Sequence, residues 1–221
     1  MDTATTLRVF AHELRVPASV IQGYTRMLRD GALNDADRDR ALAQIQQATG
    51  RLADLAREAS SVAQWLTAPP NGDAGNVEMA AIVDRAVTTA TLDAPPAMKV
   101  APAAANMRVA TSNVQALTTA LVTILEATGR EAPREPLEIQ VRQAGTAACD
   151  VAVSPQASAS LLQNSVPDGP GAEPVMLVRG GLGLSLLLAA AVLEAHHATL
   201  WTQSGSRGII VRLPVQGAHA S

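Results

Sequence analysis

Apolar side chains recur at alternating intervals of three and four residues in two stretches near the amino terminus. This alternation returns each apolar position to one face of a helix, so each stretch predicts a helix that buries a single stripe. Gly31 ends the first helix, and either Asn34 or Asp35 can cap the second. Two helices joined by a short polar turn form an antiparallel hairpin, and pairing with a second copy into a four-helix bundle would cover both stripes. The stripe positions are Leu7, Phe10, Leu14, Pro17, Ile21, Tyr24 and Leu28 in the first helix, and Ala41, Ile45, Ala48, Leu52, Leu55, Ala59, Val62 and Leu66 in the second.

A segment rich in proline and glycine follows the hairpin and has the composition of a linker. We therefore divide the chain into a helical hairpin at 1–66, a linker at 67–76 and a second domain at 77–221. In the second domain helical and strand patterns alternate, which predicts helices on one face of a mixed sheet, an α/β sandwich, and makes the whole chain α+β. The expected helices are 78–91, 113–128 and an apolar helix ending at Ala195; the expected strands are 107–110, 137–142, 150–153, 175–178, 199–203 and 209–213; 132–136 and 157–174 are expected to be loops.

Composition excludes several classes of partner and metal site and indicates where the protein resides. A net charge of -3 over 221 residues gives no electrostatic footprint for nucleic acid or for an anionic membrane. The longest apolar run, Leu186 to Leu193, is far shorter than the ~20 residues of a transmembrane helix, and no signal pattern opens the chain, so we expect a cytoplasmic protein with no membrane segment. The single cysteine, Cys149, excludes an internal disulfide and a multi-cysteine metal site.

The first helix carries candidate chemistry in the sequence Phe10-Ala11-His12-Glu13-Leu14-Arg15-Val16-Pro17. At 100° per residue, His12 lies about 200° from Phe10 and therefore points away from the buried stripe. Glu13 can orient the imidazole or accept its proton, so that the far ring nitrogen attacks as a neutral nucleophile, while Arg15 adds positive charge. The alternative is a lone, solvated surface histidine.

This order of residues resembles the phosphoacceptor box of bacterial sensor histidine kinases, in which the histidine carries a phosphoryl group. Val16 departs from the family, because kinases that also act as phosphatases carry Thr or Asn there, and an isopropyl group cannot hydrogen-bond a water. A second resemblance, to the last glycine box of the family's ATP-binding domain, begins at Gly181-Leu182-Gly183-Leu184 and runs through Glu194-Ala195-His196 to Arg212-Leu213-Pro214. It implies a kinase-type ATPase fold in which Gly181 and Gly183 would approach nucleotide phosphates at a helix start.

The residues that the family uses to hold ATP and magnesium are replaced. Thr123 and Ala127 stand where the resemblance places asparagines, and alanine offers no oxygen to Mg²⁺. Glu126 between them could compensate in part, but we interpret it as a solvated helix carboxylate. Val153 is followed by Ser154 to Ala157, with no aspartate for adenine and no glycines. Asp168-Gly169-Pro170-Gly171 is similar to the aspartate and glycine motif that is absent after Val153, but it lies too near Gly181 in the sequence. We therefore interpret it as a surface turn.

The chain therefore resembles most the bacterial histidine phosphotransferases that combine a kinase-derived hairpin with a degenerate ATP domain. The resemblance implies a homodimer that relays a phosphoryl group between the aspartates of response-regulator receiver domains through His12, with no nucleotide or metal of its own and Mg²⁺ supplied by the receiver. Helix geometry and resemblance place the receiver on Ala18, Ser19, Gln22 and Arg26. Two alternatives stay open, an ATP-dependent sensor histidine kinase core and a non-catalytic scaffold.

Overall fold

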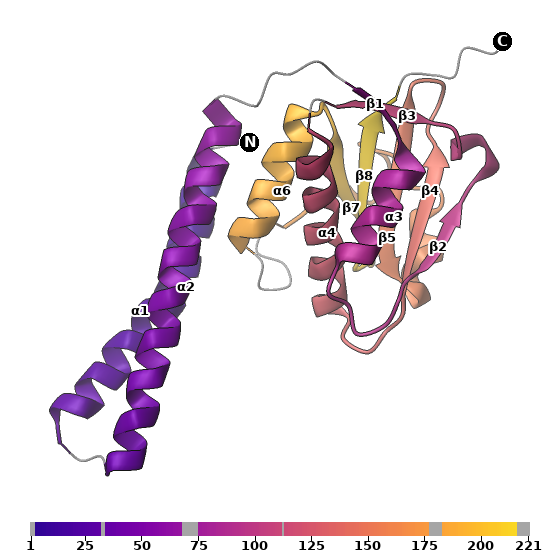
Figure 1. Ribbon diagram of the computed structural model, residues 1–221. Helices are drawn as coiled ribbons and strands as arrows, with labels where there is room; N and C mark the ends of the chain where they lie inside the picture. Colours follow the sequence, from indigo (N-terminus) through magenta and orange to yellow (C-terminus); the bar gives the residue numbers. More distant parts are fainter. Residues whose placement is uncertain (1–2, 32–33, 68–74, 112, 177–182, 216–221) are drawn as a thin grey trace.

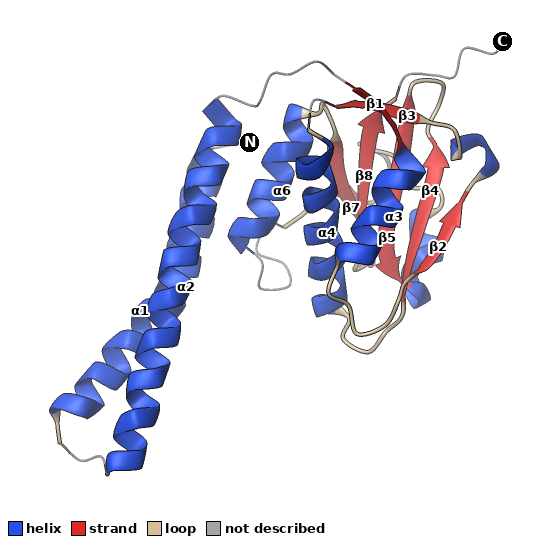
Figure 2. Cartoon of the chain, viewed as in Figure 1, coloured by secondary structure: helices blue, strands red, loops and turns tan. Residues whose placement is uncertain are grey.

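The computed structural model describes residues 3–31, 34–67, 75–111, 113–176 and 183–215. Figures 1 and 2 show a long helical hairpin beside an α/β unit in which helices cover one face of a sheet. This α+β arrangement confirms the fold class expected from the sequence. Within the described residues, no helix combines the length and apolar character needed to cross a membrane.

The hairpin consists of α1 (Thr3–Arg29) and α2 (Asp35–Thr67). Asn34 is the cap of α2, because its Oδ1 accepts the Asp37 backbone N–H at 2.9 Å. The predicted stripe of α2 is confirmed at its most buried positions, which are spaced seven residues apart. In α1 the stripe is less complete, since Leu7 is 61% exposed. The buried positions of α2 are Ala41, Ala48, Leu55 and Val62, and the side chain of Leu66 lies outside the described residues.

The α/β unit is built on a six-stranded sheet of order β2-β4-β5-β8-β7-β6. β2 pairs with β4 in parallel and the other neighbours are antiparallel, so the sheet is mixed as predicted. A separate two-stranded ribbon joins β1 and β3. The elements are β1 (Gly75–Glu78), α3 (Met79–Thr89), β2 (Ala97–Val100), the 3-10 turn η1 (Pro102–Ala104), β3 (Arg108–Thr111), α4 (Val114–Glu131), β4 (Leu137–Gln143), β5 (Ala148–Pro155), the 3-10 turn η2 (Gln156–Ser158), α5 (Ala159–Leu162), β6 (Ala172–Glu173), α6 (Gly183–Ala195), β7 (Thr199–Gln203) and β8 (Ile209–Pro214).

One main core fills the space between the sheet and the layer formed by α3, α4 and α6. Alternate residues of the central strands point into it, among them Ile139, Val151 and Val211, and they meet Leu117 and Ile124 of α4. The strand period of two explains the pattern, because every second side chain faces the same side of a sheet. The core is almost purely aliphatic, as the 2% aromatic content requires.

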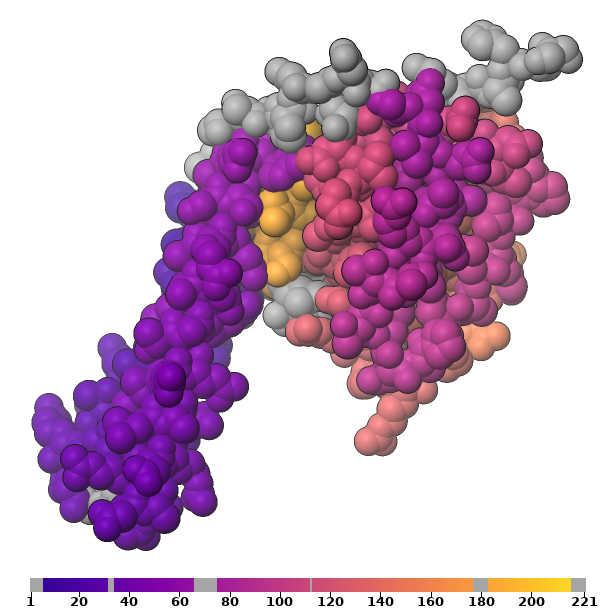
Figure 3. Space-filling view, viewed as in Figure 1, coloured from indigo at the N-terminus to yellow at the C-terminus, as the bar shows by residue number. Residues whose placement is uncertain are grey.

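Helix α6 is apolar on nearly all sides, because one side packs against the main core and another against the hairpin. Leu186 and Leu193 pack into the main core, whereas Leu184 and Leu187 join a second core with Val9, Leu55 and Val62 of the hairpin. A helix that is hydrophobic all round is expected to be enclosed. The hairpin is therefore fastened to the α/β unit through α6, which lies between them in Figures 1 and 3.

Several sequence expectations were wrong in detail. Strand β2 was missed, because it is a short edge strand whose side chains are mostly exposed and carry no alternating pattern. Residues 175 and 176 form no strand, and 177–178 lie outside the described residues. The segment expected to be a loop at 157–174 contains parts of η2, α5 and β6. The domain limits at 66, 67–76 and 77 stay predictions, since 68–74 are not described.

Candidate functional site

His12 lies on the outer surface of α1, and its side chain is exposed, as the helical geometry predicted. It shares the exposed face of α1 with Arg15, Ser19, Gln22 and Arg26, spaced three and four residues apart. Ala18 is half-buried, so it borders this face. The role expected for His12 requires an accessible side chain, and His12 is exposed.

Glu13 turns the other way, into the contact between the hairpin and α6. Its side chain is 14% exposed, and its Oε2 lies 3.5 Å from Nη2 of Arg51 on α2. The same guanidinium reaches Oε1 of Glu58 at 3.5 Å through Nη1. The ion-pair partner of Glu13 is therefore Arg51 of α2. The role predicted for Glu13, orienting the imidazole of His12, stays a prediction.

Gly183, the first residue of α6, lies directly against Glu13. A Cβ atom built on Gly183 would come within 2.6 Å of Oε1 of Glu13. Any side chain at this position would force the Glu13 carboxylate to shift. A carboxylate beside the amino end of a helix is also favoured by the helix dipole. The end of α6 that the resemblance assigns to nucleotide phosphates is thus approached by a carboxylate of the hairpin. Gly181, its predicted neighbour at that site, lies outside the described residues.

Replacing Gly183 with alanine is expected to loosen the hairpin from α6. The new methyl group would displace the flexible Glu13 carboxylate and weaken its contact with Arg51, at a cost of about 1 kcal/mol or less. Thermal denaturation should show a lower Tm than the wild type. Gly145→Ala is unsuitable as a control because of its positive φ, whereas Gly23→Ala in α1 has open space around it and should leave Tm unchanged or raise it.

The residues that stand at the expected asparagine positions of α4 are engaged in core packing or in a hydrogen bond within the helix. Ala127 is 1% exposed and belongs to the main core. The hydroxyl of Thr123 donates to the Thr119 carbonyl at 3.0 Å, within its own helix. Oε1 of Glu126 accepts the Thr91 backbone N–H at 3.0 Å, which ties α4 to the end of α3. Glu126 therefore has a structural contact, and in the described part of the chain no three His, Cys, Asp or Glu side chains gather to hold a metal ion.

Residues 156–173 cross the sheet face that turns away from α3, α4 and α6. Leu162 is fully buried there against Trp201, Ile210 and Ala152, in a small third core. Asp168 has a φ of 60° and is exposed, which agrees with the interpretation of 168–171 as a surface turn. The β6 pairing with β7 then returns the chain to the sheet edge.

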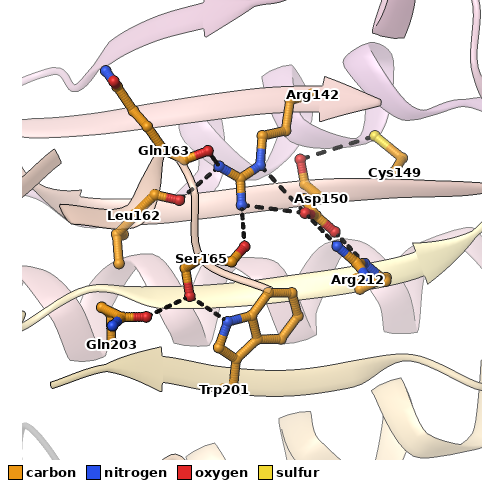
Figure 4. Close-up of polar contacts among 9 residues, drawn as sticks. All are labelled: Arg142, Cys149, Asp150, Leu162, Gln163, Ser165, Trp201, Gln203 and Arg212. Atoms are coloured by element: carbon orange, nitrogen blue, oxygen red, sulfur yellow. Dashed lines mark hydrogen bonds and ion pairs between the residues drawn. The ribbon is translucent and has the colours of Figure 1, made fainter. Parts of the chain in front are cut away.

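A buried polar cluster fastens this segment, and sequence reasoning missed it (Figure 4). Asp150 of β5 accepts two hydrogen bonds from Arg212 of β8, Nε to Oδ1 at 2.7 Å and Nη2 to Oδ2 at 2.9 Å. Arg142 of β4 reaches Oδ2 of Asp150 at 3.2 Å and donates to the backbone carbonyls of Leu162, Gln163 and Ser165. A usable signal was present, because Asp150 interrupts an apolar strand whose neighbours each place an arginine opposite it.

The rest of the cluster connects the segment to β7. The indole Nε1 of Trp201 donates to Oγ of Ser165 at 2.8 Å, and that hydroxyl donates to Oε1 of Gln203 at 2.8 Å. The guanidinium of Arg212 lies over the Trp201 ring, 5.3 Å from its centroid. Its hydrogen bonds to Asp150 raise the pKa of Arg212 above its usual value. The cluster is a structural clamp that holds the segment on the sheet.

Cys149 lies next to this clamp and is expected to be chemically inert in the folded protein. Burial, with a smaller contribution from the charge of Asp150, raises the pKa of its thiol to about 12. Since the thiolate is the reactive form, alkylation by iodoacetamide near neutral pH should be negligible in the native state and rapid after denaturation. Intact-mass measurement before and after adding denaturant checks this, and rapid native alkylation would contradict it.

Comparison with known proteins agrees with this geometry. Residues 4–63 match the family model of the His Kinase A (phospho-acceptor) domain, which covers the hairpin that carries His12. No curated protein sequence matched the chain. Among solved structures, the histidine kinase AdeS of Acinetobacter baumannii is 15% identical, with a TM-score of 0.53 over 94% of this chain and 98% of that one. Full-length ShkA in complex with AMPPNP is 14% identical, with a TM-score of 0.54 over 100% of this chain and 47% of that one.

At these identities the structural matches show a shared fold. The chain thus spans nearly all of the AdeS structure and about half of ShkA. The phospho-acceptor match covers the hairpin, and the structural matches show that the fold of the whole chain resembles that of the two histidine kinase structures.

Proposed function

We propose that this chain carries a phosphoryl group on His12 and exchanges it with the aspartate of a response-regulator receiver domain, as a homodimer in a two-component system. The observation that carries the proposal is an exposed histidine on a hairpin that matches the phospho-acceptor family. Exposure allows a partner to reach the imidazole, and the coiled-coil-like hairpin holds it on a rigid element. Positioning of this kind supplies most of what phosphoryl transfer needs from a protein.

The chemical step is a displacement at phosphorus. A neutral ring nitrogen of His12 attacks the phosphorus of an aspartyl phosphate, the bond from phosphorus to the carboxylate oxygen breaks, and its electron pair stays on the aspartate. The imidazole then releases the proton on its other nitrogen to water. The reverse sequence passes the group to a second receiver. The Mg²⁺ that offsets the phosphoryl charge would be held by the receiver.

Dimerisation is supported by apolar surface that the single chain leaves uncovered on the hairpin. Val16 and Met27 of α1 and Leu42 of α2 are 64%, 47% and 50% exposed. Apolar side chains repeated along an exposed helical face are typical of a partner interface. A second hairpin that covers part of this apolar surface and leaves His12 accessible would complete a four-helix bundle.

A second candidate function is an ATP-dependent histidine kinase, which would load His12 itself. The comparisons support this candidate better than the relay, because the family model and both structural matches concern histidine kinases, and ShkA was solved with AMPPNP. The residues of this chain support the relay instead. Ala127 is buried in the core, no aspartate for adenine follows Val153 where the resemblance expects one, and Glu13 lies against the start of α6.

One experiment with two arms separates the candidates. The purified chain is incubated with γ-labelled ATP and Mg²⁺ alone, and separately with receiver domains that were phosphorylated beforehand. Label from the receivers and none from ATP is the expected result. Label from ATP alone would establish the kinase. If both arms fail while the chain still binds receivers, the non-catalytic scaffold is the remaining function.

A further inference from the structure

An open hollow of about 540 Å³ lies on the sheet face that turns away from α3, α4 and α6. Arg142, Asp150 and Arg212 of the central strands form its base, and residues 143–145 and 163–166 form its rim. Small-molecule sites in proteins commonly have volumes of about 300–1,000 Å³. The start of α6, to which the resemblance assigns nucleotide phosphates, lies on the other side of the sheet, so this hollow is a separate candidate site.

The base of the hollow holds more positive than negative charge. Two guanidiniums, those of Arg142 and Arg212, flank the single carboxylate of Asp150 (Figure 4). No other Asp, Glu, Lys or Arg is among the described residues that line the hollow, so one positive charge has no counter-charge there. Arg142 has no donor to spare, because its Nε, Nη1 and Nη2 atoms all donate to Asp150 or to the carbonyls of residues 162, 163 and 165. The excess charge is therefore available at Arg212.

Arg212 presents an unused edge of its guanidinium to the hollow. Its Nε and one N–H of Nη2 bind Asp150 at 2.7 and 2.9 Å. We call Nη1 and the second N–H of Nη2 the open fork, because no residue that the structure describes accepts a hydrogen bond from them. A guanidinium fork matches the paired oxygens of a carboxylate or a phosphate. Asp150 on one edge and the Trp201 ring, 5.3 Å away, already hold the side chain in place, so binding would require little further ordering.

The rim adds polar and apolar groups that are free to contact a ligand. Asn164 and Gln143 are exposed, and neither carboxamide has a hydrogen-bond partner among the described residues. A carboxamide can donate to a ligand oxygen and accept from a ligand hydroxyl. Val166 is 48% exposed and offers an apolar contact. These groups favour a small ligand that carries a polar substituent and a short apolar part next to its negative charge.

We infer that this hollow binds a small organic carboxylate, which occupies the open fork of Arg212 and contacts the amide of Asn164. One excess positive charge matches the single negative charge of a carboxylate. A phosphate monoester carries about −1.5 to −2 near neutral pH and would leave uncompensated negative charge beside Asp150. The site is independent of the proposed function, because neither phosphoryl transfer through His12 nor autokinase activity requires it.

Nuclear magnetic resonance of the isotope-labelled full chain tests the site. The chain has two tryptophans, Trp65 and Trp201, and a Trp65→Phe variant assigns their indole N–H signals. The Trp201 ring lies against Arg212 and its N–H bonds to Ser165, so L-lactate should shift this signal saturably, with a Kd of about 1 mM or lower. The Trp65 signal should not move. Glycerol 3-phosphate should bind more weakly when the ionic strength is held constant with KCl.

Three variants assign the binding to the hollow. Asn164→Asp places a carboxylate at the rim, and repulsion should weaken lactate binding about tenfold. Gln115→Glu makes the same change of charge at an exposed position of α4 and should bind lactate as the wild type does. Arg212→Lys keeps a positive charge beside Asp150 but removes the open fork, which should also weaken binding about tenfold. Circular dichroism verifies folding, and Asn164→Asp decides the test if Arg212→Lys does not fold.

Three results would overturn the inference. The first is the lack of a saturable Trp201 shift at about 20 mM lactate. The second is equal lactate binding by Asn164→Asp and Gln115→Glu, which would place the ligand elsewhere on the surface. The third is tighter binding of glycerol 3-phosphate than of lactate, which would assign the hollow to phosphates. A saturable shift that weakens in Asn164→Asp supports the site, whether or not a receiver labels His12.

Discussion

Asp150→Ala is expected to lower the free energy of unfolding by about 3–5 kcal/mol, the range for breaking a buried ion pair by removing one partner. The carboxylate of Asp150 is 2% exposed and receives both Arg142 and Arg212. Without this carboxylate, the guanidiniums of Arg142 and Arg212 lie close together in the sheet with no negative charge between them. Arg142 is then no longer held in the position from which it donates to the carbonyls of Leu162 and Ser165. Urea denaturation monitored by circular dichroism measures the loss.

The controls separate charge from packing. Asp84→Ala removes an exposed carboxylate on α3 and should change stability by less than about 0.5 kcal/mol. A variant with Arg142, Asp150 and Arg212 all replaced by apolar residues should be more stable than Asp150→Ala, because no unpaired charge remains, but less stable than the wild type, because the carbonyls of residues 162–165 lose their donor. Trp201 fluorescence in a Trp65→Phe background reports whether the segment has left the sheet, since the indole bonds to Ser165. An Asp150→Ala protein as stable as the wild type would contradict the clamp.

His12→Ala is expected to reduce phosphoryl transfer from a phosphorylated receiver by more than about 10³-fold, to background, because the nucleophile itself is removed. Stability should be unchanged within about 0.5 kcal/mol, since the side chain is exposed. Receiver binding should also persist, because the docking face remains. The measurement is the rate at which label leaves the receiver and appears on the chain.

A histidine outside the proposed site provides the matched control. His197 is exposed in the turn after α6 and has a φ of 57°, a conformation that asparagine tolerates. His197→Asn should therefore fold and transfer normally. If transfer survives in His12→Ala and fails in His197→Asn, the phosphoryl group is carried by His197, which would contradict the proposal for His12.

The helical part of the molecule was largely predictable from the sequence, because it is governed by local periodicity. The three-four alternation identified both hairpin helices and placed Leu55 and Val62 on the buried side of α2 and His12 on the outside of α1. Strands were likewise expected at 199–203 and 209–213, and β7 and β8 lie there.

The rest depends on contacts between residues far apart in the chain. Residues 156–173 are held by hydrogen bonds from Arg142 to backbone carbonyls. Every sequence has such carbonyls, so no local pattern predicts the path of this segment. The approach of Glu13 to Gly183 joins positions 170 residues apart and follows from the docking of α6 on the hairpin. Glu13 was therefore expected beside His12 alone, and its contact with Arg51 could be found only in three dimensions.

The most direct test of the account is to map the phosphorylated residue after the chain is mixed with a phosphorylated receiver. We predict an acid-labile phosphoryl group on His12, identified by tandem mass spectrometry under alkaline conditions, and none after incubation with Mg-ATP alone. A phosphoryl group acquired from Mg-ATP without any partner, or one found on a residue other than His12, would contradict it.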